Sequence, residues 1–479
     1  METLHGIINE INSFLWTYVI IIALIGSGVI FTLRTKFVQL RMLKEMFRLI
    51  FTTAGAKTED KEVSAFQAFC ISTASRVGVG NIAGVAIAIV TGGPGAVFWM
   101  WLIAFIGCAT GFVESTLAQI YKLPREGGAF HGGPAYYIKN ALHQPGLAKW
   151  FAILISITFG WIYVSVQANT IVQSVETAFG VSQTVTAFVV AILSGIVIFG
   201  GATRIAKFTE MIVPVMAGIY LLSALIIVVM NIDQVPALFA LIIHDAFTPQ
   251  AAVGGGFGTV FMTGVRRGLF SNEAGEGSVP NAAATASGKH PARQGLIQSF
   301  GVYVDTWFVC SATAFSVLLT GEYQIGGDLT GVALVQHSLA TVYGTYAPHV
   351  LSVIVFLFAF SSIVGNYYYG EVNIAFFEGD ETGALPSSLA KNAINIFRVG
   401  VIAMVLFGSF AELSFVWDSA DLFMGFLCLT NLYALARIGK FAFIVLDDYV
   451  EQKNRGIEEP VFDQKIMPTQ EGMYAWKKS

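Results

Sequence analysis

Residues 74–85, ASRVGVGNIAGV, hold three glycines in seven positions directly after an arginine. Glycine lowers helix propensity, so a helix that reaches this stretch is expected to unwind there. Unwinding exposes carbonyl oxygens at the end of one half-helix and N–H groups at the start of the next. Because carbonyl oxygens suit Na⁺ and a helix N-terminus attracts a carboxylate, the chemistry indicated is the binding of an anion beside a cation.

Two other interpretations of the glycines are weaker. A dinucleotide-binding loop requires GxGxxG after a strand, with an acidic residue about 20 positions later. Here the spacing is GxGxxxG, the flanks are apolar, and Met100 and Trp101 stand at that distance. Close helix packing through small residues explains Gly84 and Gly111. It does not explain the polar side chains that gather around the glycines, namely Ser72, Thr73, Ser75, Arg76 and Asn81.

The composition indicates what kind of helices surround this glycine-rich stretch. The chain has 479 residues, of which 55% are hydrophobic and 12% charged, whereas soluble domains carry about 25% charged residues. Many apolar runs approach or exceed the roughly 18 residues needed to cross a bilayer. We therefore predict an all-α integral membrane protein with about eleven spans. The expected spans are 14–33, 65–90, 95–121, 150–178, 184–200, 210–230, 255–287, 293–320, 347–377, 392–409 and 415–436.

A second interruption, GLFSNEAGEGSVPNAAATA at 268–286, breaks the seventh span as the glycines break the second. Ser278 is expected to cap the half-helix that follows. Each broken span opens a set of five, and the two sets start from opposite sides of the membrane. This arrangement predicts an inverted repeat with a binding site between the broken helices. The expected segments are an N-terminal span with a cytoplasmic interfacial helix (1–64), a first repeat (65–230), an extracellular connection (231–254), a second repeat (255–436) and a cytoplasmic tail (437–479).

Basic residues lie on one side of the predicted spans. The connection 34–64 carries seven Lys and Arg residues and 122–149 carries four, whereas 231–254 and 321–346 carry none. The positive-inside rule then places the N-terminus outside and the C-terminus in the cytoplasm. Within the basic connection, 37–51 has its charges on one helical face and predicts a helix that lies in the cytoplasmic interface.

The residues needed for other classes of site are missing from the apolar runs. The four cysteines show no CxxC spacing, the seven histidines lie in loops or at span ends, and no HExxH or GxSxG motif occurs. A disulfide, a metal cluster, a haem site and a membrane-embedded enzyme are therefore not expected. No nucleic-acid partner is expected either.

Four segments, taken together, resemble the signature segments of the alanine/glycine:cation symporter family. They are GVGNIAGVA, GGPGAVFWMWLIAFIG, FSNEAGEGSVPNAAA and FAFSSIVGNYYYGE, in this order and spread over essentially the whole chain. The resemblance implies a leucine-transporter-like fold of two inverted five-helix repeats plus one extra N-terminal helix. It also implies Na⁺-coupled uptake of a small neutral amino acid, typically alanine or glycine, across a prokaryotic plasma membrane, with Na⁺ as coupling ion and no organic cofactor. The oligomeric state stays open.

The resemblance also implies the residues of the site. Backbone amides at the first interruption would receive the substrate carboxylate, and Asn81 would orient that segment or bind a first Na⁺. For Gln167, an interhelical hydrogen bond is an equal alternative. The implied substrate-binding residues are Thr73, Gly78, Val79, Gly80, Asn81, Gln167, Phe270, Ser271, Asn272 and Asn366. The implied ligands of a second Na⁺ are the carbonyls of Ala74 and Val77 and the hydroxyls of Ser361 and Ser362.

Two residues depart from the family pattern. Asn366 follows Gly365, where better-known members often have a bulky aromatic residue, and a smaller polar side chain there favours a pocket that also admits serine or glutamine. Arg76 stands where many members have a neutral residue. Since an arginine near the bilayer centre costs about 2.5 kcal/mol or more, it is expected to pair with a carboxylate, as a structural ion pair or as a substrate or gating contact. The expected partners are Glu273, Glu276 and Glu371.

Other charged residues leave two questions open. Arg266 and Arg267 precede the second interruption and are expected to pair with Glu273 or Glu276, which would close an outer gate. Coupling to protons in the same fold is the alternative to Na⁺, and its candidate carriers are Glu114, Asp305 and Glu371. A channel is a further class, but two inverted halves around one central site favour alternating access.

Overall fold

The computed structural model describes residues 2–53, 62–125, 130–200, 202–247, 256–377 and 388–476. Parts of the expected interfacial segment (54–61), of the connection after the first repeat (248–254) and of the tail (477–479) lie outside the described residues. The described chain is mostly helical.

The N-terminal half contains two strands among its helices. The strands β1 (Leu123–Pro124) and β2 (Phe130–His131) pair antiparallel, with Leu123 opposite His131. The helices are α1 (Glu2–Leu15), α2 (Ile21–Arg34), α3 (Val38–Arg41), α4 (Leu43–Thr53), α5 (Ala65–Arg76), α6 (Val85–Gly92), α7 (Gly95–Ile120), α8 (Pro134–Asn140), α9 (Pro145–Ile157), α10 (Val164–Phe179), α11 (Gln183–Ile198), α12 (Ala202–Met230) and α13 (Val235–Phe247).

The C-terminal half is helical, and π-helical turns join several helices along the chain. Its helices are α15 (Gly256–Asn272), α16 (Val279–Ala283), α17 (Pro291–Val302), α18 (Ser311–Thr320), α19 (Gly331–Tyr343), α20 (Ala347–Ala375), α21 (Ser388–Phe410), α22 (Leu413–Ile438) and α23 (Lys440–Asn454). The π-helical turns are Trp16–Ile20, Gly80–Gly84, Thr158–Tyr163 and Tyr303–Cys310, and two short 3₁₀ helices, Gln464–Ile466 and Tyr474–Trp476, lie in the tail.

The membrane-spanning character of the chain is confirmed, but the number of spans is not. Among the described residues, eight helices are long and apolar enough to cross a bilayer, or nine if the bent pair Ala65–Arg76 and Gly80–Gly92 is one span. Two expected spans are represented by shorter helices, α11 with 16 residues and α15 with 17. The total of eleven therefore stays a prediction.

Both predicted interruptions are present. The first helix pair bends by 50° around 77–79, where Val77 leaves the helical region with ψ at 81°. At the second interruption α15 ends at Asn272, and the chain turns through Gly275 and Gly277, both with positive φ, before α16 begins. Positive φ is accessible to glycine without steric cost, so these two glycines allow the reversal.

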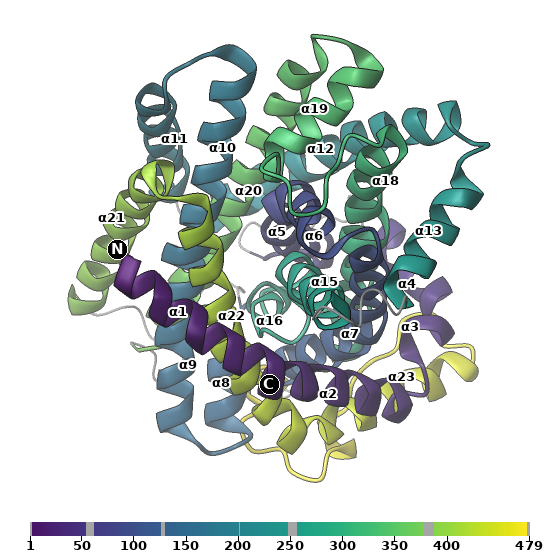
Figure 1. Cartoon of the computed structure of the whole chain (residues 1–479). Helices are drawn as coiled ribbons and strands as arrows, with labels where there is room; N and C mark the ends of the chain where they lie inside the picture. The colour runs from purple at the N-terminus through teal and green to yellow at the C-terminus, as the bar shows by residue number, and fades with distance from the viewer. Residues whose placement is uncertain are drawn as a thin grey trace.

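The two broken helices lie against each other in the middle of the molecule. Figure 1 shows α5, α6, α15 and α16 near the centre, with α10, α11 and α21 on one side and α13 on the other. The half-helix α16 contacts α5, and α15 contacts the π-helical turn that precedes α6. Polar groups from both interruptions therefore meet inside the bundle.

Two local expectations are corrected. The segment 37–51 is not one helix: it divides at Met42 into α3 and α4, and the buried side of α4 faces α17. Ser278 stands at the start of α16 without capping it, because its hydroxyl donates to Glu273 Oε2 at 2.6 Å instead.

Candidate functional site

The first interruption turns two backbone N–H groups toward side-chain oxygens. The N–H of Gly78 donates to Asn81 Oδ1 at 2.9 Å, and the N–H of Val79 donates to Gln167 Oε1 at 3.1 Å. Gln167 comes from α10, so this bond also joins two helices. A carboxylate offers the same acceptor chemistry as these amide oxygens, and the start of a helix favours its charge.

Space at this interruption is limited. A Cβ added to Gly78 would collide with Ser362 Oγ and lie 3.0 Å from Gln167 Oε1. A Cβ added to Gly80 would lie 2.9 Å from Phe270 Cδ1. The glycines therefore let the backbone approach α20 and α15 more closely than any other residue would.

A polar cluster lies beside this segment, centred on Asp305. Asn81 Nδ2 donates to Asp305 Oδ1 at 2.6 Å and to Ser271 Oγ at 2.9 Å, and Ser271 Oγ donates to Asp305 Oδ2 at 2.7 Å. Asp305 is fully buried, and within the described part of the chain no Lys or Arg forms an ion pair with it. A buried carboxylate without a cationic partner is costly, so this cluster suits a bound cation or a proton.

The cluster shows what sequence reasoning missed. Asn81 and Ser271 were expected at the site, but Asp305 was named only as a proton carrier. The signal was a lone acidic residue in the eighth predicted span, and an isolated charge in an apolar run does not say which helix it faces.

The two adjacent serines of α20 point in different directions. Ser362 Oγ lies 2.9 Å from the carbonyl oxygen of Ala74 and 3.1 Å from that of Ser75, at the end of α5. Ser361 instead faces α12, where its hydroxyl lies 3.5 Å from Met216 Sδ. Thr73 is buried, and its hydroxyl has no hydrogen-bond partner among the described residues. Oxygen atoms thus converge at the end of α5. The hydroxyl of Ser362 is one of them, and the hydroxyl of Ser361 is not.

Asn366 and Asn272 form hydrogen bonds at the ends of α5 and α15. Asn366 Oδ1 accepts a hydrogen bond from Ser75 Oγ at 2.6 Å, on the α20 side of α5. Asn272 Oδ1 accepts from the N–H of Ala274 at 3.0 Å and so holds the end of α15.

Aromatic rings cover the site on the side of α22. Phe270 lies 4.8 Å from Tyr163 and 4.8 Å from Trp417, measured between ring centroids. Trp417 also approaches Gly84, where an added Cβ would lie 3.2 Å from the indole ring. Three helices therefore meet in one aromatic layer beside the first interruption.

The expected pairing of Arg76 with a glutamate is not found among the described residues. Arg76 is 2% exposed, and its Nη1 donates to the carbonyl of Gln298 on α17 at 3.0 Å. Gly301 makes room for it, because a Cβ there would collide with Nη1.

The three expected partners of Arg76 bind other groups. Glu273 accepts from Ser75 and Ser278 at 2.6 Å each, Glu276 from the Tyr163 hydroxyl at 3.2 Å, and Glu371 pairs with Arg398 at 2.8 Å.

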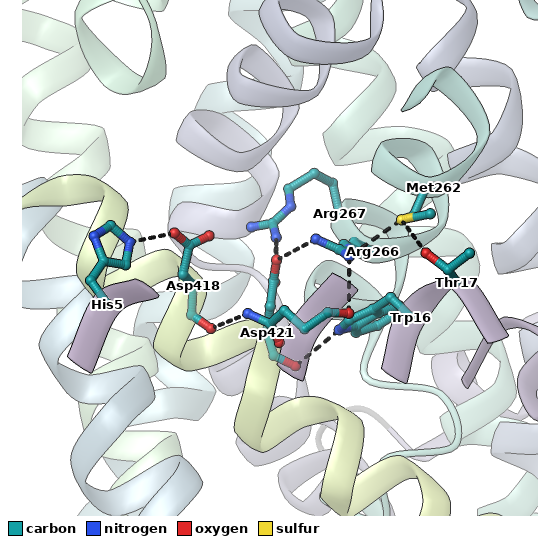
Figure 2. Close-up of polar contacts among 9 residues, drawn as sticks. His5, Trp16, Thr17, Met262, Arg266, Arg267, Asp418 and Asp421 are labelled. Carbon is teal, nitrogen blue, oxygen red and sulfur yellow. Dashed lines mark hydrogen bonds and ion pairs between the residues drawn. The ribbon is translucent and has the colours of Figure 1, made fainter. Parts of the chain in front are cut away.

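The arginines before the second interruption also differ from expectation. Arg267 forms an ion pair with Asp421 of α22, and Arg266 Nη1 lies 3.7 Å from the same carboxylate. Figure 2 shows both guanidinium groups directed at Asp421. The expected partners Glu273 and Glu276 lie beyond the end of α15, where the chain has turned away from the arginines.

This ion pair lines an open cavity together with Trp417 of the aromatic layer. The cavity has a volume of about 480 Å³. Its lining includes Thr91, Thr263, Arg266, Arg267, Trp417 and Asp418. Arg267 also stacks over Trp417, with 4.7 Å between Cζ and the ring centroid. Charged and aromatic groups from α15 and α22 thus line this cavity together.

Comparisons with known proteins agree on the family and the fold. Residues 1–464 match the model of the sodium:alanine symporter family. The amino-acid carrier protein AlsT of Bacillus subtilis (strain 168) is 48% identical over 474 residues, covering 99% of this chain and 98% of that protein. The probable sodium/glutamine symporter GlnT of the same organism is 46% identical over 478 residues, covering 100% and 97%. The crystal structure of MhsT in complex with L-phenylalanine matches with a TM-score of 0.57 at 12% identity, covering 88% of this chain and 94% of that one.

Proposed function

The chain belongs to the sodium:alanine symporter family, and we propose that it imports a small neutral amino acid together with Na⁺ by alternating access. Membership of a transporter family implies translocation rather than catalysis. The leucine-transporter-like fold supplies two broken helices that face each other at the centre of the bundle. The proposed membrane orientation has the N-terminus outside and the C-terminus in the cytoplasm of a prokaryotic cell. The proposed repeats are 65–230 and 255–436.

The observation that carries the proposal is the neutral hydrogen-bonding shell of Asp305 beside the freed N–H groups of Gly78 and Val79. The carboxylate needs a cation to offset its buried charge. The N–H of Val79 donates to Gln167, and the N–H of Gly78 donates both to Asn81 and to the carbonyl of Arg76. A substrate carboxylate would accept from these N–H groups when it displaces the side-chain amides of Asn81 and Gln167. Cation and anion sites then stand next to each other, as cotransport requires.

We assign two cation positions to these groups. The first lies beside Ser271 Oγ and the carboxylate of Asp305. Asn81 turns its Nδ2 toward both groups, so its amide must reverse before its oxygen can bind a cation there. The second lies at the end of α5, between the carbonyl of Ala74 and the hydroxyl of Ser362, with the Thr73 hydroxyl and the Val77 carbonyl as further candidates. Ser361 is a weaker ligand candidate, because its hydroxyl faces α12.

The ion pair between Arg267 and Asp421 is the proposed outer gate. Both of its residues line the cavity that Thr91 and Thr263 also line, next to Trp417 of the aromatic layer. Opening requires α22 to separate from α15, which breaks the ion pair and the stack of Arg267 on Trp417. Arg76 has no such place at the cavity, so we assign it to the interior packing between α5 and α17.

Alanine or glycine is the proposed substrate, with serine or glutamine as the alternative. The side chain of Phe270 fills space next to Gly80, which favours a small substrate. Asn366 is hydrogen-bonded to Ser75 near the end of α5, and its amide gives the alternative substrates a polar contact.

Uptake into membrane vesicles tests the proposal directly. Labelled alanine, glycine, serine and glutamine are offered with an inward Na⁺ gradient, and again with choline in place of Na⁺ at fixed pH. We expect alanine or glycine to accumulate only with Na⁺. Undiminished accumulation in choline, lost when a proton gradient is collapsed, would instead establish proton coupling, with Glu114, Asp305 and Glu371 as the candidate carriers.

A further inference from the structure

A stripe of four residues on α1 and the π-helical turn that continues it faces α22. His5, Asn12, Trp16 and Ile20 are separated by seven, four and four positions, a spacing that places them on one side of a helix. Asn12 is 3% exposed and Trp16 and Ile20 are fully buried, although several other residues of this helix, such as Phe14, are exposed. We call these four residues the α1 strap.

The strap contacts the turn of α22 that carries the gate carboxylate. Asn12 Nδ2 donates to the carbonyl of Asp418 at 2.8 Å, and Trp16 Nε1 donates to the carbonyl of Asp421 at 3.2 Å. His5 Nε2 lies 2.7 Å from the carboxylate of Asp418. Figure 2 shows the Trp16 and His5 contacts beside the arginines. Two side chains of one helix thus bind the backbone of α22 on either side of a single turn.

The strap also contacts the other half of the gate. Arg266 Nη2 donates to the carbonyl of Asn12 at 3.5 Å, and its guanidinium lies 5.2 Å from the Trp16 ring centroid. Because Arg266 also approaches Asp421 at 3.7 Å, α1, α15 and α22 share one network. The position of Asp421 relative to Arg267 therefore depends on where α1 lies.

Close packing fixes the register of the strap. A Cβ added to Gly425 of α22 would collide with Ile20 Cδ1. Trp16–Ile20 is itself a π-helical turn, a wide turn that often occurs at functional sites. The tight contact at Gly425 and the hydrogen bonds to the carbonyls of Asp418 and Asp421 therefore oppose sliding of α22 along α1.

We propose that α1 is a positioning element of the outer gate: Asn12 and Trp16 hold the 418–421 turn of α22 where Asp421 meets Arg267. This inference rests on the proposed function, since it concerns the gate of a transporter. The first helix is then more than an additional span, because it biases the gate toward its closed state. Weakening the strap raises the population in which α22 has moved away from α15.

Labelling of Cys310 measures that population without measuring transport. Cys310 is 3% exposed, and its Sγ lies 3.0 Å from Ser271 Oγ within the central cluster, behind the gate. Intact cells that express the full chain are treated with a membrane-impermeant methanethiosulfonate reagent, and the label on Cys310 is followed by peptide mass spectrometry. We expect slow labelling in the parent protein, because the reagent reaches Cys310 only when the gate opens.

Asn12→Leu keeps the branched shape of the side chain, Trp16→Phe keeps an aromatic ring in a smaller side chain, and each substitution removes one strap hydrogen bond. We expect each to raise the labelling rate about fivefold, given the net contribution of a neutral hydrogen bond. Ser27→Ala is the matched control on α2, which continues the same span. Its hydroxyl donates to the carbonyl of Ala23 within α2, so this variant should label at the parent rate. Equal rates in all four proteins, or an equal rise in Ser27→Ala, would overturn the proposal.

Two further measurements keep the outcome decisive. If the strap variants do not reach the membrane, Gly425→Ala displaces Ile20 from the α22 side and must raise the labelling rate; an unchanged rate overturns the proposal. Na⁺-dependent uptake by the parent protein is measured in parallel. Absence of uptake with a normal labelling pattern would refute the symport proposal and leave the strap intact, whereas normal uptake with no labelling difference would refute the strap alone.

Discussion

Each helix interruption lies between two half-helices, but different chemical groups bind the backbone of the two interruptions. At the first, the N–H groups of Gly78 and Val79 are held by neutral amide oxygens of Asn81 and Gln167. At the second, buried carboxylates hold the chain: Glu114 Oε1 accepts from the N–H of Gly275 at 3.2 Å.

Further contacts make the second interruption a closed structure. Asn431 of α22 donates both to Glu114 Oε2 at 2.9 Å and to the carbonyl of Gly275 at 3.0 Å. Glu273 has a positive φ of 56° and binds Ser75 and Ser278 through its two oxygens. A neutral amide is displaced by a ligand at lower electrostatic cost than a carboxylate that holds its own backbone. The first interruption is therefore suited to bind and release a ligand, and the second to support it.

The largest effect is expected at the first interruption. Gly80→Leu should reduce amino-acid uptake to background, because its side chain would collide with Phe270 and fill the space next to the freed N–H groups. Uptake and membrane insertion are measured together. Gly218→Leu is the control, since nothing lies within 4 Å of a Cβ at that position. Normal uptake by Gly80→Leu would contradict the assignment of the site.

A change at the second interruption should lower stability more than substrate affinity. Glu114→Leu leaves the buried N–H of Gly275 without an acceptor, at a cost of about 1–3 kcal/mol. Thermal unfolding in detergent measures this loss, and half-saturation by substrate should stay near the parent value. Glu114→Gln keeps an oxygen for Gly275 and should lose less stability. A large change in substrate half-saturation with unchanged stability would reverse the comparison.

Substitutions of Ser361 and Ser362 on α20 distinguish a role in cation binding from a role in helix packing. Ser362→Ala should raise the Na⁺ concentration for half-maximal uptake about tenfold, as expected when a charge-assisted contact is lost. Ser361→Ala is its neighbour and control, and should leave the Na⁺ dependence unchanged because that hydroxyl faces Met216. Equal effects of the two substitutions would show that both hydroxyls reach the ion.

The smallest effect is expected at the end of α7, where Lys122 binds the segment that follows the second interruption. Lys122 lies just beyond α7, and its Nζ donates to the carbonyl of Ala286 at 2.7 Å and to Gln119 Oε1 at 2.9 Å. Burial lowers the pKa of Lys122 to about 7. Between that value and the pKa of free lysine, near 10.4, the unfolded chain binds a proton that the folded chain has released, so stability rises with pH.

Thermal unfolding at pH 7 and pH 9 measures this dependence. The parent protein should be more stable at pH 9, and Lys122→Met should lose most of that difference. Lys289→Met is the control, because Lys289 is exposed and pairs only at the surface with Glu459. An unchanged pH dependence in Lys122→Met would assign it to other groups.

Composition and the positions of helix-breaking glycines were sufficient to predict much of this architecture. The low charge content, the long apolar runs and the glycines at 78, 80, 275 and 277 predict a helical membrane protein with two broken helices, and both interruptions are present. The physical reason is local. A bilayer admits helices because their backbone bonds are satisfied within the segment, and glycine makes unwinding inexpensive at those places.

The ion-pair partners of the buried arginines could not be predicted from composition and local sequence. The sequence predicts that Arg76 pairs with Glu273, Glu276 or Glu371, and that Arg266 and Arg267 pair with Glu273 or Glu276. In the structure Arg266 and Arg267 face Asp421, and Arg76 donates to a backbone carbonyl. Nothing in the linear order places Asp421 on the face of α22 that meets α15, or Gly301 where it leaves room for a guanidinium. An ion pair depends on distances of a few ångströms between helices, and those distances follow from how whole side-chain surfaces fit together.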